Sequence, residues 1–256
     1  MKRKFEREFR ENEALEIIEK IKIGVVGAGR GSGTSFIASG IALAAAEHYK
    51  KAVAFAELPD GTSGRTWLYD IAGMDKRFGG RNYESLHKKV RHGRYIRGIR
   101  NMDSGVNWAA CTAEDRNSGL TDVQKARLIN NISGDIVICD MGINADEEIM
   151  ADMDAIICVV DPKPSRLIDT RELYQTIKQE QLKGRDVIWV LNKMNGGVNR
   201  RCFREYVKIK GAFEIPLIKD IHFYAAEYNC RFPAEQREIK KVSNDILQDI
   251  VKKIIV

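Results

Sequence analysis

The chain has 256 residues, of which 44% are hydrophobic and 30% charged, and its formal net charge is +6. These values describe a soluble globular protein of one α/β domain, since such domains often exceed the usual length of about 150 residues. No apolar run approaches the roughly 18 residues of a membrane-spanning helix, and the charged first twenty residues lack the apolar region of a secretion signal. We therefore expect a cytoplasmic protein whose moderate basic charge permits an anionic partner without requiring one.

The cysteines and histidines indicate neither a disulfide framework nor a zinc site. The five cysteines are an odd number, they lie far apart, and no C-x-x-C pair is present. Three of them lie in apolar strand-like segments, where a thiol behaves as a small hydrophobic group. The four histidines show no metal-ligand spacing. The cysteines are Cys111, Cys139, Cys158, Cys202 and Cys230.

The predicted elements alternate between short apolar strands and helices. Residues 1–20 are expected to form a charged helix or tail, and residues 21–256 a single domain. Short, almost continuously apolar strands alternating with helices indicate an α/β fold with a mostly parallel central sheet and helices on both faces. Ligands of such sheets bind outside the carboxyl ends of the strands. We predict strands at 21–26, 52–58, 106–111, 135–139, 155–160, 187–191 and 213–218, and helices at 35–49, 121–131, 165–182, 199–209 and 234–253, with helical pieces within 62–104.

The segment 21–41, IKIGVVGAGRGSGTSFIASGI, is the most informative part of the chain. A strand runs into a glycine-rich turn and a small-residue helix, the layout of a phosphate-binding loop whose backbone N–H groups form an anion cradle. A Walker A loop reads G-x-x-x-x-G-K-[ST], with the lysine on the phosphates and the hydroxyl on Mg²⁺. Aligned on its second glycine and hydroxyl, this chain has Thr34 in place of the lysine and Ala28 in place of the first glycine. The expected cradle residues are Gly29, Arg30, Gly31, Ser32, Gly33, Thr34 and Ser35.

Three later groups of motifs follow this loop in a fixed order. They are AVAFAELPDG, then DIVICDMG, and finally VVDPKPSRLIDTRELYQTI with VIWVLNKMNGG and FEIPLIKDIHFYAAEYNCR. Together with the loop they resemble the ParA/MinD family of P-loop ATPases from about residue 21 to the C-terminus. Within that family, the altered loop is most similar to the TadZ/CpaE branch, which helps to localise type IV (Flp/Tad) pilus machinery.

The resemblance implies ATP and Mg²⁺ as cofactors and assigns catalytic and metal roles. It places Ser35 and Asp140 at the magnesium ion, the latter through water, and Glu57 at the first carboxylate of the second-strand motif. The position that orients the attacking water is occupied by Pro59, with Asp60 one step late. Each role has a structural alternative: a helix first-turn hydroxyl for Ser35, a turn-opening aspartate for Asp140, and a turn-flanking residue for Glu57.

The resemblance also addresses the remaining contacts to the nucleotide. Gly29 stands where the family has an additional lysine that acts across a dimer, so Arg30 either supplies that cation from a shifted position or is a solvated loop residue. Asn192 is expected to hydrogen-bond an adenine edge. Asn195 cannot accept both guanine N–H donors as a carboxylate would, which makes GTP the less favoured nucleotide.

The altered residues favour binding over catalysis. Phosphoryl transfer depends on electrostatic stabilisation, and one positioned arginine contributes roughly 10³ to 10⁵ in rate. The leading hypothesis is an ATP-binding protein with slow or absent hydrolysis, acting as a homodimeric localisation or scaffold factor for secretion or pilus machinery, at the inner face of the membrane or a cell pole. Two alternatives stay open: an active ATPase that cycles between monomer and dimer, and a nucleotide-free interaction protein.

Two further segments each allow two interpretations. Residues 76–100 contain nine Lys/Arg and one Glu with interleaved aromatics, which fits contact with nucleic acid or an anionic membrane, or a solvated region opposite an acidic partner surface. Residues 238–256 carry isoleucine and valine at near-helical spacing. Because this segment has no aromatic residue, a helix docked on the core is favoured over a membrane-targeting helix.

Overall fold

A computed structural model describes residues 20–58, 68–79, 82–115, 119–143, 146–169 and 171–255. The predictions made for residues 1–19 and for Pro59 and Asp60 lie outside the described residues.

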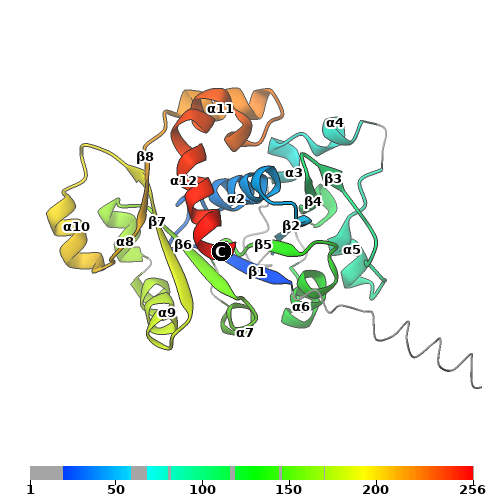
Figure 1. The fold of residues 1–256 in the computed structure, drawn as a ribbon, viewed down its shortest axis with the longest axis horizontal. Helices are drawn as coiled ribbons and strands as arrows, with labels where there is room; N and C mark the ends of the chain where they lie inside the picture. The colour runs from blue at the N-terminus through cyan, green and yellow to red at the C-terminus, as the bar shows by residue number, and fades with distance from the viewer. Residues whose placement is uncertain are drawn as a thin grey trace, which may run out of the picture.

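The core of the fold is one eight-stranded sheet (Figure 1). Its strand order is β3-β4-β2-β5-β1-β6-β7-β8, and every neighbouring pair is parallel except β3 and β4. The predicted fold class, a mostly parallel sheet with helices on both faces, is therefore confirmed. The strands are β1 (Ile21–Gly27), β2 (Val53–Glu57), β3 (Met102–Asp103), β4 (Val106–Ala109), β5 (Ile136–Asp140), β6 (Ala155–Val160), β7 (Asp186–Met194) and β8 (Phe213–Pro216).

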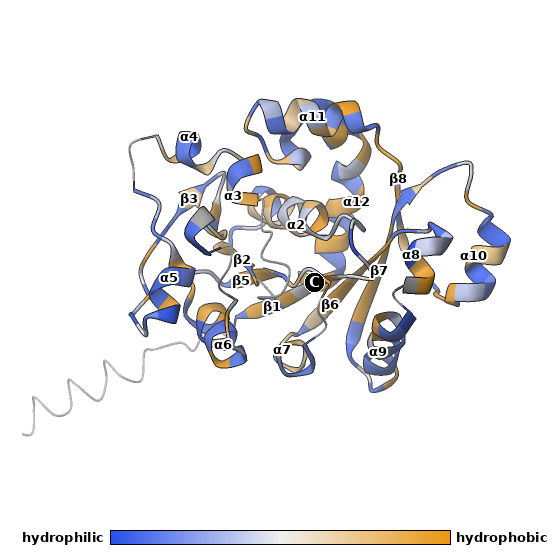
Figure 2. Ribbon diagram, turned by 180° about the vertical axis from the view of Figure 1, so that it is seen from behind, coloured by the Kyte–Doolittle hydropathy of each residue, from blue (hydrophilic) through white to orange (hydrophobic). Residues whose placement is uncertain are grey.

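The helices cover both faces of the sheet. Alternate residues of one strand enter different cores: Ile136 and Ile138 pack beneath α2 and α12, whereas Val137 and Cys139 pack against the layer containing α6, α7 and α9. In Figure 2 the strands are largely apolar, whereas the outer helix α9 is largely hydrophilic. The helices are α2 (Thr34–His48), α3 (Leu68–Ile71), α4 (Met74–Phe78), α5 (Leu86–Arg91), α6 (Asp122–Asn131), α7 (Glu147–Ala151), α8 (Pro164–Asp169), α9 (Arg171–Leu182), α10 (Arg200–Val207), α11 (Asp220–Tyr228) and α12 (Arg237–Ile255), with 3-10 turns η1 (Ala113–Asp115) and η2 (Pro233–Glu235).

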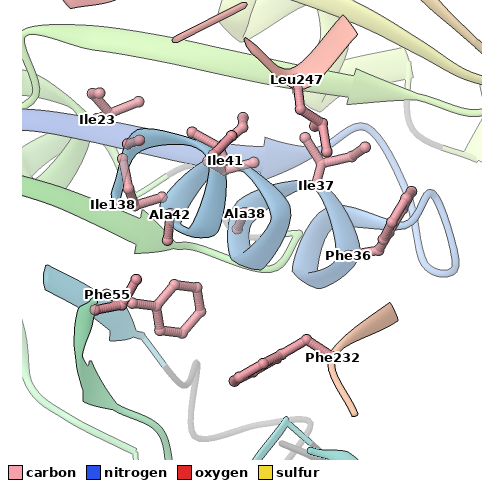
Figure 3. Close-up of a cluster of buried hydrophobic side chains, with 14 of the residues drawn as sticks. Ile23, Phe36, Ile37, Ala38, Ile41, Ala42, Phe55, Ile138, Phe232 and Leu247 are labelled. Atoms are coloured by element: carbon pink, nitrogen blue, oxygen red, sulfur yellow. The ribbon is translucent and has the colours of Figure 1, made fainter. Parts of the chain in front are cut away.

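The C-terminal helix α12 docks on the core, as the sequence favoured. Ile239, Leu247 and Ile250 are buried, and Leu247 lies against α2 (Figure 3). The contact is close because residue 40 of α2 is glycine: a Cβ there would come within 2.8 Å of a Leu247 methyl group. Among the described residues, no helix combines the length and the apolar composition needed to cross a membrane.

Leu247→Ala is expected to destabilise the protein by about 2–5 kcal/mol, because it removes buried methyl groups and leaves a cavity against α2. Val242, on the same helix, is 39% exposed, and its change to alanine should cost about 0.5 kcal/mol or less. Urea unfolding of both variants measures the difference. Equal stabilities of the two variants would contradict the docking of α12 through Leu247.

Candidate functional site

The glycine loop lies at the carboxyl edge of the sheet, beside its central strand. β1 is flanked by β5 and β6 and is followed directly by residues 28–33 and then by α2. From β1 the chain continues to β2 on one side, whereas β6, β7 and β8 extend the sheet on the other side. Such a reversal of strand order opens a crevice at the carboxyl ends of the strands, which is where parallel α/β sheets bind ligands.

The loop presents backbone N–H groups at the start of α2. Gly31 and Gly33 have φ angles of 74° and 91°, a region that glycine enters without strain. At the base of the loop, the Ala28 N–H donates to the Val159 carbonyl at 2.8 Å, and the Ser32 N–H donates to the Gly29 carbonyl at 3.2 Å. Because Gly33 has no side chain to cap α2, the N–H groups of its first turn are available to an anion, which the helix dipole also favours.

The residue in place of the Walker A lysine faces into the loop. Thr34 and Ser32 are buried, and their hydroxyl oxygens lie 3.0 Å apart. Both hydroxyls pack over Gly27, where they occupy the space that a Cβ would need. Position 34 is therefore filled by a short, neutral side chain that supplies no positive charge to a phosphate.

Ser35 and Asp140 come together at the mouth of the loop. The exposed Ser35 side chain lies beside the Asp140 carboxylate, whose Oδ1 accepts the Gly142 N–H at 3.1 Å. Burial raises the pKa of Asp140, and the neighbouring Ser35 hydroxyl and Gly142 N–H partly oppose that rise. A hydroxyl beside a carboxylate is a donor set that suits Mg²⁺, so the residues present fit this ion.

The predicted catalytic residue Glu57 lies next to Asp140 in the sheet, because the two residues are paired in register on β2 and β5. The Glu57 side chain is buried and accepts the Cys111 N–H at 2.8 Å. Burial, followed by the charge of Asp140, raises the pKa of Glu57 to about 8. Glu57 therefore carries a proton at neutral pH. His87 is buried beside it and donates through Nε2 to the Glu57 backbone carbonyl at 2.6 Å.

Glu57→Gln is expected to flatten the pH dependence of stability. The folded state holds the Glu57 proton up to about pH 8, whereas the unfolded state releases it near pH 4.5, so this contribution to stability is complete below pH 4.5 and is lost as the pH rises to about 8. The glutamine variant should gain stability at pH 8 on the order of 4 kcal/mol or less. Guanidinium unfolding at pH 5 and pH 8 tests this prediction, and the same pH slope in both proteins would contradict it.

Asn192 and its neighbour Lys193 contact the loop from the end of β7. The Asn192 amide donates to the Ser32 carbonyl at 2.8 Å, and its Oδ1 accepts the Lys193 N–H at 3.0 Å. The Lys193 ammonium group donates to the Gly31 carbonyl and lies 3.3 Å from Asp161. The contact of Asn192 with adenine remains a prediction. Sequence reasoning missed Lys193, although its place beside Asn192 in NKMN was a signal that could have found it.

Arg30 takes no part in the contacts that Asn192 and Lys193 make with the loop. Its side chain is exposed at the tip of the loop, and within the part of the chain that the structure describes it forms no hydrogen bond or ion pair. Its role as a shifted cation remains a prediction.

A cavity of about 770 Å³ opens beside the loop, at the carboxyl ends of β6 and β7. Leu167, Phe203 and Leu217 give it apolar walls, and Asp161 and Lys193 connect it to the loop. Its volume lies within the usual range for small-molecule sites.

The Asn195 side chain stays within its own turn, since its amide donates to the Lys193 carbonyl at 2.9 Å and its Oδ1 accepts the Gly197 N–H at 2.9 Å.

Much of the basic charge in residues 76–100 is neutralised inside the protein. Ion pairs join this segment to acidic residues within it and outside it: Arg77 with Asp103, Lys88 with Glu114, Lys89 with Glu84 and Arg91 with Asp115. Arg94, Arg97 and Arg100 are exposed. A contact of this surface with nucleic acid or a membrane remains a prediction.

The fold is that of ParA and MinD ATPases. A ParA-family ATPase from Chlorobium tepidum aligns at a TM-score of 0.64 and 15% identity over 92% of this chain and 98% of its own. A putative plasmid partition protein from Borrelia burgdorferi, bound to AMPPNP, aligns at a TM-score of 0.67 and 15% identity. The alignment covers 92% of this chain and 100% of that protein. The Pyrococcus furiosus cell division ATPase MinD aligns at a TM-score of 0.63 and 16% identity, over 91% of this chain and 99% of its own. No protein-family model and no curated protein sequence matches the chain.

Proposed function

We propose that this protein binds ATP with Mg²⁺ at the loop between β1 and α2. The observation that carries the proposal is the contact of the Ser35 hydroxyl with the Asp140 carboxylate at the mouth of that loop. These groups would hold the metal, while the N–H groups of the loop and of the first α2 turn would hold the phosphates. The bound ion would supply positive charge next to the transferable phosphate. The partition protein of the same fold that contains AMPPNP supports this assignment.

The protein would hydrolyse bound ATP slowly or not at all. Thr34 brings no charge to the phosphates, and Glu57 is protonated at neutral pH because of its raised pKa, so it is a poor base for an attacking water. Transition-state charge in phosphoryl transfer is stabilised mainly by positioned cations, and one such group is worth roughly 10³ or more in rate. A site with these two features favours a long-lived nucleotide complex.

The base would lie in the cavity beside the loop. Its apolar walls suit a purine ring, and Asn192 contacts the loop next to Lys193, which lines the cavity. Adenine is favoured over guanine because both polar groups of Asn195 are engaged in its own turn, and because Asn195 is not the carboxylate that would accept two guanine N–H donors.

The nucleotide-bound protein would act as a homodimer that localises other proteins. Helix α11 supports a docking role, since Ile221, Tyr224 and Tyr228 form an exposed stripe along it and Tyr228 is 90% exposed. Phe223 anchors this helix on Phe36 in the first turn of α2, with ring centroids 5.6 Å apart. The suggested setting, pilus assembly, comes from the sequence resemblance of the loop to the TadZ/CpaE branch.

Two measurements on the purified chain separate this proposal from its alternatives. Sedimentation with and without Mg-ATP reports the oligomer, and phosphate release reports turnover. A dimer with release no faster than the protein-free blank supports the proposal. Steady phosphate release that Arg30→Ala abolishes would show an active ATPase instead. A dimer that binds no nucleotide would show an interaction protein without nucleotide function.

A further inference from the structure

We infer that the outer face of α11 is the docking surface for a basic amphipathic helix of a partner protein. The inference deepens the proposed localisation role and rests on it, because a protein that localises others needs a surface that binds them. It adds the chemistry that such a partner must have.

The two faces of α11 have different surroundings. The helix lies at the rim of the fold, outside α2 and α12 (Figure 1). Its inner face is anchored by Phe223, whose ring meets that of Phe36 edge-on. Its outer face carries Ile221, Tyr224 and Tyr228, which are 65%, 62% and 90% exposed. Three large apolar side chains gathered on one exposed face are typical of an interaction site.

Two carboxylates border this apolar stripe. Asp220 precedes the central Tyr224 by four residues and Glu227 follows it by three, so both are its neighbours on the helix surface. Because the two acids are seven residues apart, or about two turns, they lie along the same side of the stripe. Both are exposed, and within the part of the chain that the structure describes neither forms an ion pair.

These carboxylates select the charge of the occupant. Helix α11 contains no lysine or arginine that could neutralise them. A partner that covers the stripe also removes water from the neighbouring carboxylates, which costs free energy unless the partner brings cations of its own. An apolar partner surface bordered by lysine or arginine therefore fits this face.

Other occupants match this face less well. Two copies of α11 packed antiparallel about a two-fold axis would place their acidic borders on the same side of the contact, and a parallel pair would bring no cation from α11 either. Nucleic acids and anionic membranes carry negative charge as well. A helix with an apolar stripe and basic borders satisfies both features, since the two stripes pack along each other and the borders have opposite charge.

The test is a titration of a fluorescent designed peptide with the full chain, followed by anisotropy. The peptide has leucine along one helical face and lysine along its borders, and a matched peptide has glutamate in place of each lysine. The wild type should bind the lysine peptide at least about 10-fold more tightly than the glutamate peptide. Tyr224→Ala should weaken binding of the lysine peptide by about 10-fold or more, as expected for a tyrosine at the centre of an interface. Tyr95→Ala, at an exposed tyrosine outside α11, should bind it within about twofold of the wild type.

The role of charge is tested by neutralising both carboxylates. Asp220→Asn combined with Glu227→Gln should weaken the lysine peptide by about fivefold or more and reduce the salt dependence of its binding. Asp249→Asn combined with Glu172→Gln makes the same chemical changes at exposed positions on α12 and α9, and should leave the affinity within about twofold. Thermal unfolding shows that each variant is folded.

Equal affinity of the wild type for the two peptides would overturn the inference, as would unchanged binding by Tyr224→Ala. Dissociation of a dimer of the chain by Tyr224→Ala, measured by sedimentation, would show that a second copy occupies the stripe. Binding to phosphatidylserine vesicles that Tyr224→Ala abolishes would show a membrane there, and either result overturns the inference.

Titration of the same preparation with Mg-ATP judges the proposed function separately. A chain that binds the lysine peptide through the stripe but binds no Mg-ATP would support the inference and remove the proposed nucleotide site. A chain that binds Mg-ATP but not the peptide would overturn the inference alone.

Discussion

Gly33→Val is expected to lower the affinity for Mg-ATP by about 100-fold or more. Gly33 has a φ of 91°, a conformation that a β-branched residue adopts only with strain. A Cβ at this position would also overlap the amide nitrogen of Asn192. The substitution therefore displaces Asn192 from the Ser32 carbonyl and turns the loop N–H groups away from the phosphates. Two lost charge-assisted hydrogen bonds are enough for a loss of this size.

The matched control for this prediction is Gly196→Ala. Gly196 lies in the turn after β7, and a Cβ there meets no atom within 4 Å. Its affinity for Mg-ATP should stay within about twofold of the wild type. Calorimetry on both variants, with thermal unfolding to show that each is folded, provides the comparison. Wild-type affinity in folded Gly33→Val would remove the loop from the nucleotide site.

Asp140→Asn is expected to abolish the dependence of ATP binding on Mg²⁺. Asp140 brings the carboxylate to the metal position beside Ser35, and an amide oxygen in its place carries no charge for a hard cation. ATP affinity in the variant should be nearly the same with Mg²⁺ and with EDTA. The wild type should bind at least about 10-fold more tightly with Mg²⁺, on the scale of a single charged metal ligand.

The same variant should be no less stable than the wild type at pH 8. Burial raises the pKa of Asp140, and the neighbouring Glu57 is a second buried carboxyl group, so a neutral amide relieves the cost of a buried charge. Asp249→Asn makes the same chemical change on the outer face of α12 and should retain normal Mg²⁺ dependence. If Asp140→Asn retains full Mg²⁺ dependence, the ion binds elsewhere.

The central strands were predictable because they are buried on both faces. Residues 155–160 are all apolar and four of them are β-branched, and β6 has these bounds in the structure. The loop was predictable for a different reason, since a turn between a strand and a helix that contains three closely spaced glycines has few other uses. The predicted strand at 213–218 ends in the structure at Pro216, and one further backbone hydrogen bond, from the Leu217 N–H to the Met194 carbonyl at 2.8 Å, follows it.

Other features depend on contacts that local sequence does not encode. Residues 165–182 were predicted to be helical, and α8 and α9 cover this segment on either side of residue 170, which lies outside the described residues. The helix α11 was not predicted, and its position depends on packing against η2, α12 and α3 and on the contact of Phe223 with Phe36 of α2. The two-residue antiparallel strand β3 is too short for a periodic signal. Lys193 meets the loop across about 160 positions of sequence, a contact that only the folded sheet creates.

The most direct test of the account is a calorimetric titration of the wild-type chain with Mg-ATP, with phosphate release followed in the same sample. We predict saturable binding of one nucleotide per chain, together with little or no release of phosphate over the time of the titration. Absence of binding by a protein that still unfolds cooperatively would contradict it. The loop would then be only a feature of the fold, and the exposed stripe on α11 would be the next place to look for function.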